Sequence, residues 1–332
     1  MQSFTFDRAR SVKDAVRGAA QARTAQQGAE VRFVAGGTTL IDLMKLDVEQ
    51  PRQIIDINAL PLADVERLAD GRLRIGALVR NADLARHPDV TKDYPVLSQA
   101  LLAGASGQLR NMATTGGNLL QRTRCVYFRD TSMPCNKRQP GSGCSAIDGF
   151  NRNLAVLGTS EQCIASNPSD MNVALTALEA TLVIEGIKGT RQVPIGEFFL
   201  LPGTTPNRET VMEPGDLITH VLLPPPRQGA VSHYLKLRDR ASYEFALASA
   251  ALVITSDGGR ISHARVALGG VGTRPWRAPE AELALQGHAI DRMTFVRAAE
   301  AALAGARPQS QNGFKIELAR RCLIQALVTA TA

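Results

Sequence analysis

The last hundred or so residues carry the clearest alternation of hydrophobic and polar positions. Strands are expected at HYLKLRD (233–239), FALASAALVIT (245–255) and HARVALGGV (263–271), and helices at RMTFVRAAEAALAGA (292–306) and FKIELARRCLIQALVTA (314–330). In the last segment, apolar residues recur at steps of three and four, which places them on one buried helix face. Cys322 lies on that face and is expected to be a core residue. Three strands followed by two helices predict an α+β unit.

A second set of elements precedes this unit. Strands are expected at QIIDIN (53–58), LRIGALV (73–79), ATLVIEG (180–186) and LITHVLL (217–223), with helices at LIDLMK (40–45) and PVLSQALLAGA (95–105). The triple proline at 224–226 lacks backbone donors and favours extended chain, so it predicts a linker. A chain of 332 residues is longer than a single hydrophobic core usually accommodates. We expect parts at 1–60, 61–226 and 229–332.

Composition excludes several classes of function. The net charge of +7, from 38 basic and 31 acidic residues, is scattered apart from a modest cluster at Arg122, Arg124, Arg129, Lys137 and Arg138. Aromatic residues make up only 5% of the chain, which argues against a nucleic-acid partner. The longest apolar run, at 245–255, is too short to span a bilayer, and the first residues lack the apolar core of a signal peptide. We therefore expect no membrane span and no export signal.

Two glycine turns are candidates for binding an anion. AGGTT (35–39) separates a strand-like RFV from the helix-like LIDLMK, and TTGGN (114–118) forms a second turn of the same kind. Without a Cβ, glycine lets backbone N–H groups approach an anion closely. Neither turn matches the dinucleotide-binding or P-loop pattern. Each alone is an ordinary turn; the pair suits a clamp on a diphosphate.

Four of the five cysteines form the strongest candidate metal site. Three lie in CVYFRDTSMPCNKRQPGSGC (125–144), and Cys163 completes the spacing C-x9-C-x8-C-x18-C. Five cysteines are too few for a disulfide framework in a chain this long. Four thiolates can hold zinc or an iron–sulfur cluster. Because no CxxC pair is present and the intervals are long and rich in Gly and Pro, the pattern favours a [4Fe–4S] cluster, with zinc and disulfides left open.

Several motifs together resemble one protein family. They are FVAGGTTLIDLMK, ATTGGN, SNPSD, GDLITHVLLPPP and YLKLRDRASYEFAL, in this order along nearly the whole chain. The chain resembles the FAD-binding subunits of the molybdenum hydroxylases, which include xanthine dehydrogenases, carbon monoxide dehydrogenases and aldehyde oxidoreductases. The resemblance implies an α+β fold, with a two-part FAD-binding domain of the vanillyl-alcohol-oxidase type over 1–226 and a C-terminal α+β domain over 229–332.

The resemblance also implies which residues contact FAD. The first group would surround the pyrophosphate: Arg32, Phe33, Val34, Ala35, Gly36, Gly37, Thr38, Thr39 and Leu40. The second clamp would comprise Thr114, Gly117 and Asn118, with Ala105 or Gly107 near the flavin. Asp170 would bind a polar group of the flavin or ribose, Ile218 would pack on the ring system, and Lys236 would lie near the isoalloxazine. The simpler alternatives are a helix cap for Asp170 and a surface strand position for Lys236.

The cysteines fall in an insertion relative to this family. Asn118 and Ser169 are 51 residues apart, a much longer interval than most family members have. Similar insertions occur in the flavin subunits of 4-hydroxybenzoyl-CoA reductases and of enterobacterial periplasmic aldehyde oxidoreductases, and the second group is more similar. This resemblance implies that residues 119–167 are an iron–sulfur loop in which Cys125, Cys135, Cys144 and Cys163 hold a [4Fe–4S] cluster.

The function implied is electron transfer within a larger oxidoreductase. In the implied heterotrimer, a large molybdopterin subunit oxidises an aldehyde, a small [2Fe–2S] subunit relays electrons, and this chain passes them from FAD to an external acceptor. No HExxH or GxSxG motif suggests a catalytic residue. The alternatives are a free-standing flavoprotein oxidoreductase, a flavin subunit of the 4-hydroxybenzoyl-CoA reductase type, and a zinc-stapled interaction protein. The compartment is the periplasm if a partner carries a twin-arginine signal, and otherwise the cytoplasm.

Overall fold

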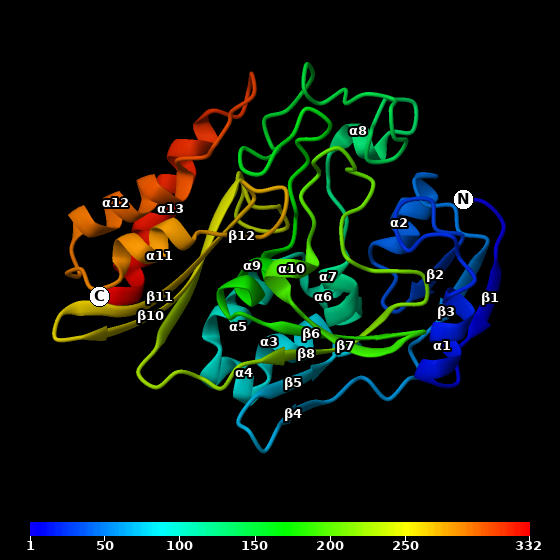
Figure 1. Ribbon diagram of the computed structural model, residues 1–332, viewed down its shortest axis with the longest axis horizontal. Coiled ribbons are helices and arrows are strands. Elements are labelled where there is room, and N and C mark those ends of the chain that lie inside the picture. The colour runs from blue at the N-terminus through cyan, green and yellow to red at the C-terminus, as the bar shows by residue number, and fades with distance from the viewer.

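The computed structural model describes residues 1–332 and contains three sheets. Figure 1 shows the N-terminal part at one end of the molecule, a middle part with most of the short helices, and the C-terminal part at the other end. The fold class expected from the sequence, α+β with an FAD-binding domain and a separate C-terminal domain, is confirmed. No helix is long and apolar enough to cross a lipid bilayer.

The N-terminal part is a small parallel sheet with two helices. Its strands are β1 (Thr5–Arg8), β2 (Val31–Val34) and β3 (Gln53–Asp56), in the order β1-β3-β2, and its helices are α1 (Val12–Ala19) and α2 (Leu40–Lys45). Helix α1 begins at Ser11, whose side chain accepts a hydrogen bond from the Asp14 N–H. Val16 of α1 and Ile55 of β3 share one buried cluster, which fixes the helix on the sheet. The turn from β2 to α2 is the first glycine turn.

The middle part is a five-stranded antiparallel sheet covered by short helices. Its order is β4 (Val65–Arg67), β5 (Leu73–Gly76), β8 (Leu217–Leu223), β6 (Thr181–Gly186) and β7 (Gly189–Pro194). The helices are α3 (Asn81–Arg86), α4 (Pro88–Asp93), α5 (Pro95–Ala103), α6 (Gly107–Met112), α7 (Thr115–Leu119), α9 (Asp170–Ala177) and α10 (Ile195–Phe198). Every second residue of β6 is buried, as expected for a strand with one face on a core. The apolar faces of the sheet and of its covering helices meet in a cluster of 33 buried residues.

The C-terminal part is an antiparallel sheet with three helices. The strands, in the order β12-β11-β10-β9, are β9 (Val231–Leu237), β10 (Ala248–Asp257), β11 (Arg260–Gly269) and β12 (Trp276–Arg277), and the helices are α11 (Pro279–Leu285), α12 (Arg292–Leu303) and α13 (Phe314–Thr331). The sequence predicted three strands and two helices here. Strand β12 has two residues and α11 has seven, so neither is long enough to show a clear periodicity. Cys322 is fully buried, as predicted.

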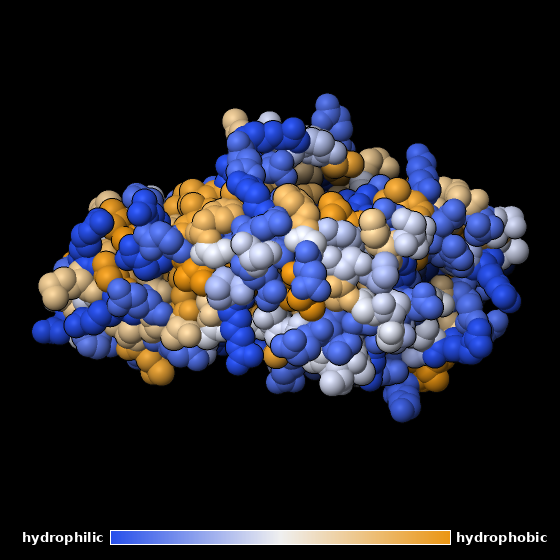
Figure 2. All heavy atoms as spheres, turned by 90° about the horizontal axis from the view of Figure 1, so that it is seen from above, coloured by the Kyte–Doolittle hydropathy of each residue, from blue (hydrophilic) through white to orange (hydrophobic).

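Between α7 and α9 a long loop stands above the two flanking parts, at the top of Figure 1. It contains one short helix, α8 (Val126–Arg129), within the stretch rich in Gly and Pro that carries three of the four candidate cysteine ligands. The loop has a small core of its own, which includes Cys125, Cys135 and Cys163 and extends to Leu43 of α2. Figure 2 views the side that carries the loop, where hydrophobic groups are interspersed with hydrophilic ones.

Candidate functional site

A large cavity, of about 260 Å³, lies where the N-terminal part meets the middle part. Both glycine turns, the C-terminal residues of β2 and the start of β8 line it. Residues 208–218 close another side, and the cysteine loop contributes Lys137 and Cys163. The two turns expected to clamp a diphosphate are therefore on one cavity, although 75 residues separate Thr39 from Thr114.

The first glycine turn presents free backbone donors. The N–H groups of Gly36, Gly37, Thr38 and Thr39 donate no hydrogen bond to any other group of the chain. Gly37 has a φ of +72°, a conformation that glycine adopts without strain. A Cβ on Gly36 would lie 1.9 Å from the Met112 carbonyl oxygen, so this turn packs directly on the end of α6. Free N–H groups in a row suit an anion with several oxygen acceptors.

The second glycine turn is more internally bonded. Thr114 begins α7, and its hydroxyl accepts the Gly117 N–H at 3.2 Å. The Gly116 N–H donates to the Ala77 carbonyl at 2.8 Å, which fixes α7 against the middle sheet. Asn118 does not line the cavity: its Oδ1 accepts the Ser169 hydroxyl at 2.8 Å. Because Ser169 begins α9, this bond joins the two ends of the cysteine loop.

The residues expected to contact FAD fall into two groups. Those that line the large cavity are Arg32, Phe33, Val34, Ala35, Gly36, Gly37, Thr38, Thr39, Leu40, Thr114, Gly117 and Ile218. Those outside it are Ala105, Gly107, Asn118, Asp170 and Lys236. The Arg32 guanidinium bonds Glu49 and the carbonyls of Ala25 and Gln26, so its charge is already compensated within the protein.

Four of the residues outside the cavity gather at a second place, where α5 and α9 meet β9. Lys236 donates to Asp170 at 2.8 Å and to the Ala103 carbonyl at 3.1 Å, and the Tyr234 hydroxyl donates to Asp170 at 2.5 Å. Ala105, with a φ of +50°, and Gly107 lie at the nearby turn into α6. Burial and then the Asp170 carboxylate raise the pKa of Tyr234 well above its usual value. Asp170 and Lys236 thus form a buried ion pair, and their contacts with a flavin stay a prediction.

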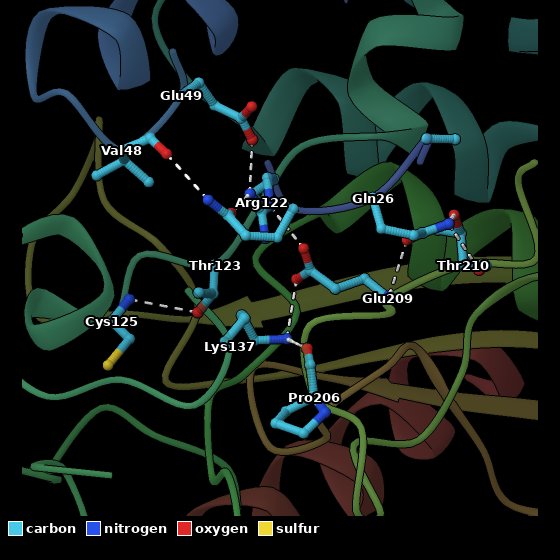
Figure 3. A network of polar contacts seen from close by, with 12 residues as sticks. Gln26, Val48, Glu49, Arg122, Thr123, Cys125, Lys137, Pro206, Glu209 and Thr210 are labelled. Atoms are coloured by element: carbon cyan, nitrogen blue, oxygen red, sulfur yellow. Dashed lines mark hydrogen bonds and ion pairs between the residues drawn. The ribbon is translucent and has the colours of Figure 1, made fainter. Parts of the chain in front are cut away.

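A buried ionic network joins the large cavity to the cysteine loop (Figure 3). Arg122 pairs with Glu49 at 2.6 Å and with Glu209 at 2.5 Å, and its guanidinium lies 4.5 Å from the ring centre of Phe128. Lys137 donates to Glu209 at 3.0 Å. Burial alone would raise the pKa of Glu209, but the charges of Arg122 and Lys137 lower it to about 2. The carboxylate therefore stays ionised across the physiological pH range.

The four candidate cysteine ligands line one small cavity. It is bounded by Cys125, Cys135, Cys144 and Cys163, with Lys137 and Ala165 among the other neighbours. Cys135 and Cys144 face each other as a short antiparallel bridge. Segments of the loop far apart in sequence thus contribute all four cysteines to the lining of one cavity. No group of three or more His, Cys, Asp or Glu side chains is arranged to hold a metal ion, and the cluster expected here stays a prediction.

The surroundings of these four cysteines suit a bound metal group whose ligands are thiolates. Burial raises the pKa of Cys125 to about 12, while the backbone N–H groups of Phe128 and Tyr127 act in the opposite direction. Burial likewise raises the pKa of Cys144 and Cys163, again against backbone N–H groups directed at the sulfur. A bound metal deprotonates a coordinating thiol, and hydrogen bonds to the sulfurs are a feature of iron–sulfur sites. Four cysteines on one cavity are a donor set that a [4Fe–4S] cluster would require, and the binding of such a cluster here stays a prediction.

Sequence reasoning missed the network that separates the two cavities. Arg122 and Lys137 were noticed only as members of a basic cluster, and Glu49 and Glu209 had no distinguishing pattern. The charge of Arg122 and Lys137 is the one indication in the sequence, because a buried arginine or lysine requires polar partners. The identity of those partners depends on tertiary contacts over 73 and 72 residues.

Comparisons with known proteins agree along the entire chain. The family described as the FAD binding domain in molybdopterin dehydrogenase matches residues 2–226, and the CO dehydrogenase flavoprotein C-terminal domain matches residues 232–330. The aldehyde oxidoreductase FAD-binding subunit PaoB of Escherichia coli strain K12 is 51% identical, over 100% of this chain and 99% of that protein.

More distant relatives share the length and the fold. The carbon monoxide dehydrogenase medium chain of Hydrogenophaga pseudoflava is 28% identical, over 99% of this chain and 97% of that protein. A solved structure of carbon monoxide dehydrogenase from the same organism, lacking the Mo-pyranopterin moiety of its cofactor, superposes with a TM-score of 0.77 over 99% of this chain and 98% of that one.

Proposed function

The chain belongs to the family of FAD-binding subunits of the molybdenum hydroxylases, and on this premise we propose that it is the flavin and iron–sulfur subunit of an aldehyde oxidoreductase. The family consists of oxidoreductase subunits. The aldehyde is proposed because the relative that is 51% identical carries that activity in its name.

The observation that supports the FAD site most directly is the cavity between the two glycine turns. The free N–H groups of residues 36–39 would donate to the pyrophosphate, and Thr114 and Gly117 would bound it from the other side. Ile218 would pack against an apolar part of the cofactor. The buried pair Asp170 and Lys236, together with Ala105, Gly107 and Asn118, would bind polar groups of FAD near its flavin ring. When bound, FAD accepts two electrons and releases them singly or in pairs.

We assign two domains, at 1–226 and 229–332, with subdomains 1–60 and 61–226 in the first. The loop at 119–167 is an insertion in the first domain whose four cysteines hold a [4Fe–4S] cluster. Support for the cluster comes from the four cysteines that line the same small cavity and from the backbone N–H groups that act on Cys125, Cys144 and Cys163. The protein would thereby fix four ligands and exclude water from three of them, since only Cys144 is partly exposed.

The proposed complex is a heterotrimer. A large subunit would carry the molybdopterin and oxidise the aldehyde, and a small [2Fe–2S] subunit would pass electrons to the FAD of this chain. From there, the electrons would reach an external acceptor. The complex would be periplasmic if a partner supplies a twin-arginine signal, and otherwise cytoplasmic.

The test is anaerobic addition of an aldehyde to the chain alone and to the chain assembled with its partners. We expect the absorption band of the oxidised flavin to bleach only in the assembled complex, because aldehyde oxidation belongs to another subunit. Bleaching in the isolated chain would contradict the proposal and favour a free-standing flavoprotein oxidoreductase.

A further inference from the structure

The large cavity and the cysteine cavity share a wall. Lys137, Cys163 and Ala165 line both of them. Lys137 belongs to the cysteine loop, two positions after Cys135, and only 8% of its surface is exposed. A buried lysine at this position is the one cationic side chain that borders both cavities.

Lys137 is held in place from the side of the FAD-binding domain. Its Nζ donates to Glu209 at 3.0 Å and to the Pro206 carbonyl at 3.1 Å, and both acceptors lie on the segment between α10 and β8. Toward the cysteine cavity, Lys137 shares the dividing wall with Cys163. The ammonium thus lies between a fixed carboxylate and a proposed cluster ligand.

The charges of the network do not cancel. Arg32, Arg122 and Lys137 contribute three positive charges, while Glu49 and Glu209 contribute two negative ones, which leaves +1 on a network that lines the large cavity and reaches the cysteine cavity at Lys137. A positive charge in a poorly solvated site stabilises an additional electron on a neighbouring group. The excess charge therefore favours the reduced form of a cofactor that borders Lys137.

We propose that Lys137, through its charge, raises the reduction potential of a cluster bound by the four cysteines. This inference rests on the proposed function. The step concerned is a one-electron transfer: the reduced flavin loses one electron and the oxidised cluster gains it. No bond forms or breaks, and no further reactant is needed.

The test is a reductive titration of the full chain, with the cluster followed by electron paramagnetic resonance. Lys137→Met removes the charge but keeps most of the aliphatic side chain. We expect iron and FAD to remain bound and the equilibrium constant for cluster reduction to fall about tenfold, which is 59 mV for one electron. Lys137→Arg should restore the wild-type potential. Lys188→Met, in the exposed turn between β6 and β7, is the control of equal charge change and should have no effect.

A second variant tests the effect of charge on the reduction potential if the Lys137→Met protein does not retain its cluster. Glu209→Gln removes a negative charge beside Lys137 and should shift the potential in the opposite direction. A cluster whose potential does not change in either charge variant would overturn the role of Lys137 while leaving the proposed cluster intact. Wild-type chain that contains FAD but no iron would instead overturn the proposed cluster itself, and this inference with it.

Discussion

At the scale of single residues, the large cavity depends on two glycines, which have no side chain. Gly36 allows the turn between β2 and α2 to lie directly against the Met112 carbonyl, and Gly37 adopts a left-handed conformation next to it. The backbone can turn sharply at these two positions because glycine has no Cβ, and the turn leaves its N–H groups without a partner in the chain. The candidate FAD site is therefore sensitive to the smallest possible substitution.

Replacement of Gly36 by Ala should abolish FAD binding. The new Cβ would lie 1.9 Å from the Met112 oxygen, so the first turn would have to move away from the second. Gly305→Ala is the matched control, because a Cβ there meets no atom within 4 Å. The measurement is flavin content per chain after purification, and a Gly36→Ala protein with normal flavin content would show that the turn does not hold the cofactor.

Replacement of Cys135 by Ser should remove iron from the chain. Serine keeps the size of the side chain but replaces the soft sulfur ligand that an iron–sulfur cluster requires. Cys322→Ala is the control, because this cysteine lies in the core of the C-terminal part and should leave the iron content unchanged. If the Cys135 variant loses flavin and solubility together with its iron, the cluster is a structural staple. A folded Cys135 variant with wild-type iron content would exclude it as a ligand.

Residue-level prediction from sequence worked where a short motif determines local backbone. Gly36 and Gly37 were expected in a turn because a strand, a glycine pair and a helix follow one another directly, and the structure confirms the turn, while their contact with FAD stays a prediction. The ion pair of Asp170 with Lys236 was not anticipated, because it joins α9 to β9 across 66 residues. Glu209 was missed for the same reason, since no local pattern marks a carboxylate whose partners come from a distant loop.

At the scale of elements, a segment before α13 holds the base of the cysteine loop. Asn312 donates to the carbonyls of Leu154 and Ala155, and the Arg307 N–H donates to Val156. Lys315, fully buried at the start of α13, donates to the carbonyls of Asn153, Leu154 and Gly270. The C-terminal part therefore shapes a loop that belongs to the FAD-binding domain in sequence.

Lys315 should make stability depend on pH. Burial, and then the charge of Arg152, lower its pKa from the usual 10.5 to about 7. Between these values the unfolded chain binds a proton that the folded chain does not, so wild-type stability should rise with pH across this window. Relative to Lys315→Met, the gain should reach at most about 1.4 kcal/mol per pH unit. Urea unfolding of both proteins at pH 7 and pH 9 measures it, and a constant difference would be incompatible with a buried, titrating lysine.

Elements were predictable in proportion to their length and periodicity. Strands β8 and β6 were located within one or two residues by their apolar residues, and helix α13 by the recurrence of apolar residues at steps of three and four. Strand β12 and helix α8 were not, because two and four residues carry no period. Their positions are set by the sheet and loop on which they lie.

At the scale of the whole molecule, the C-terminal sheet joins the two domains. Successive residues of β10 point to opposite faces: Ala251 belongs to the core of the middle part, and Leu252 to the core formed with α11, α12 and α13. Tyr234 of β9 and Ala267 of β11 also lie in the middle core. The sheet is therefore buried on both faces, and the boundary between domains in sequence is not a boundary between cores.

The isolated segment 229–332 should not fold as a stable monomer. One face of its sheet would be exposed, and Lys236 would lose the carboxylate of Asp170. The full chain should instead unfold in one transition. Calorimetry of the chain and of the segment tests this, and a segment that unfolds cooperatively at the temperature of the full chain would contradict the shared core.

If one chain holds both a flavin and an iron–sulfur cluster in adjoining cavities, the two should be present in a fixed ratio. The most direct measurement is the content of FAD, iron, sulfide and zinc in the anaerobically purified chain, with its visible spectrum on the same sample. We expect flavin bands over a broad iron–sulfur shoulder, with about four irons and four sulfides per FAD. Flavin without iron, or zinc bound in place of iron, would contradict it.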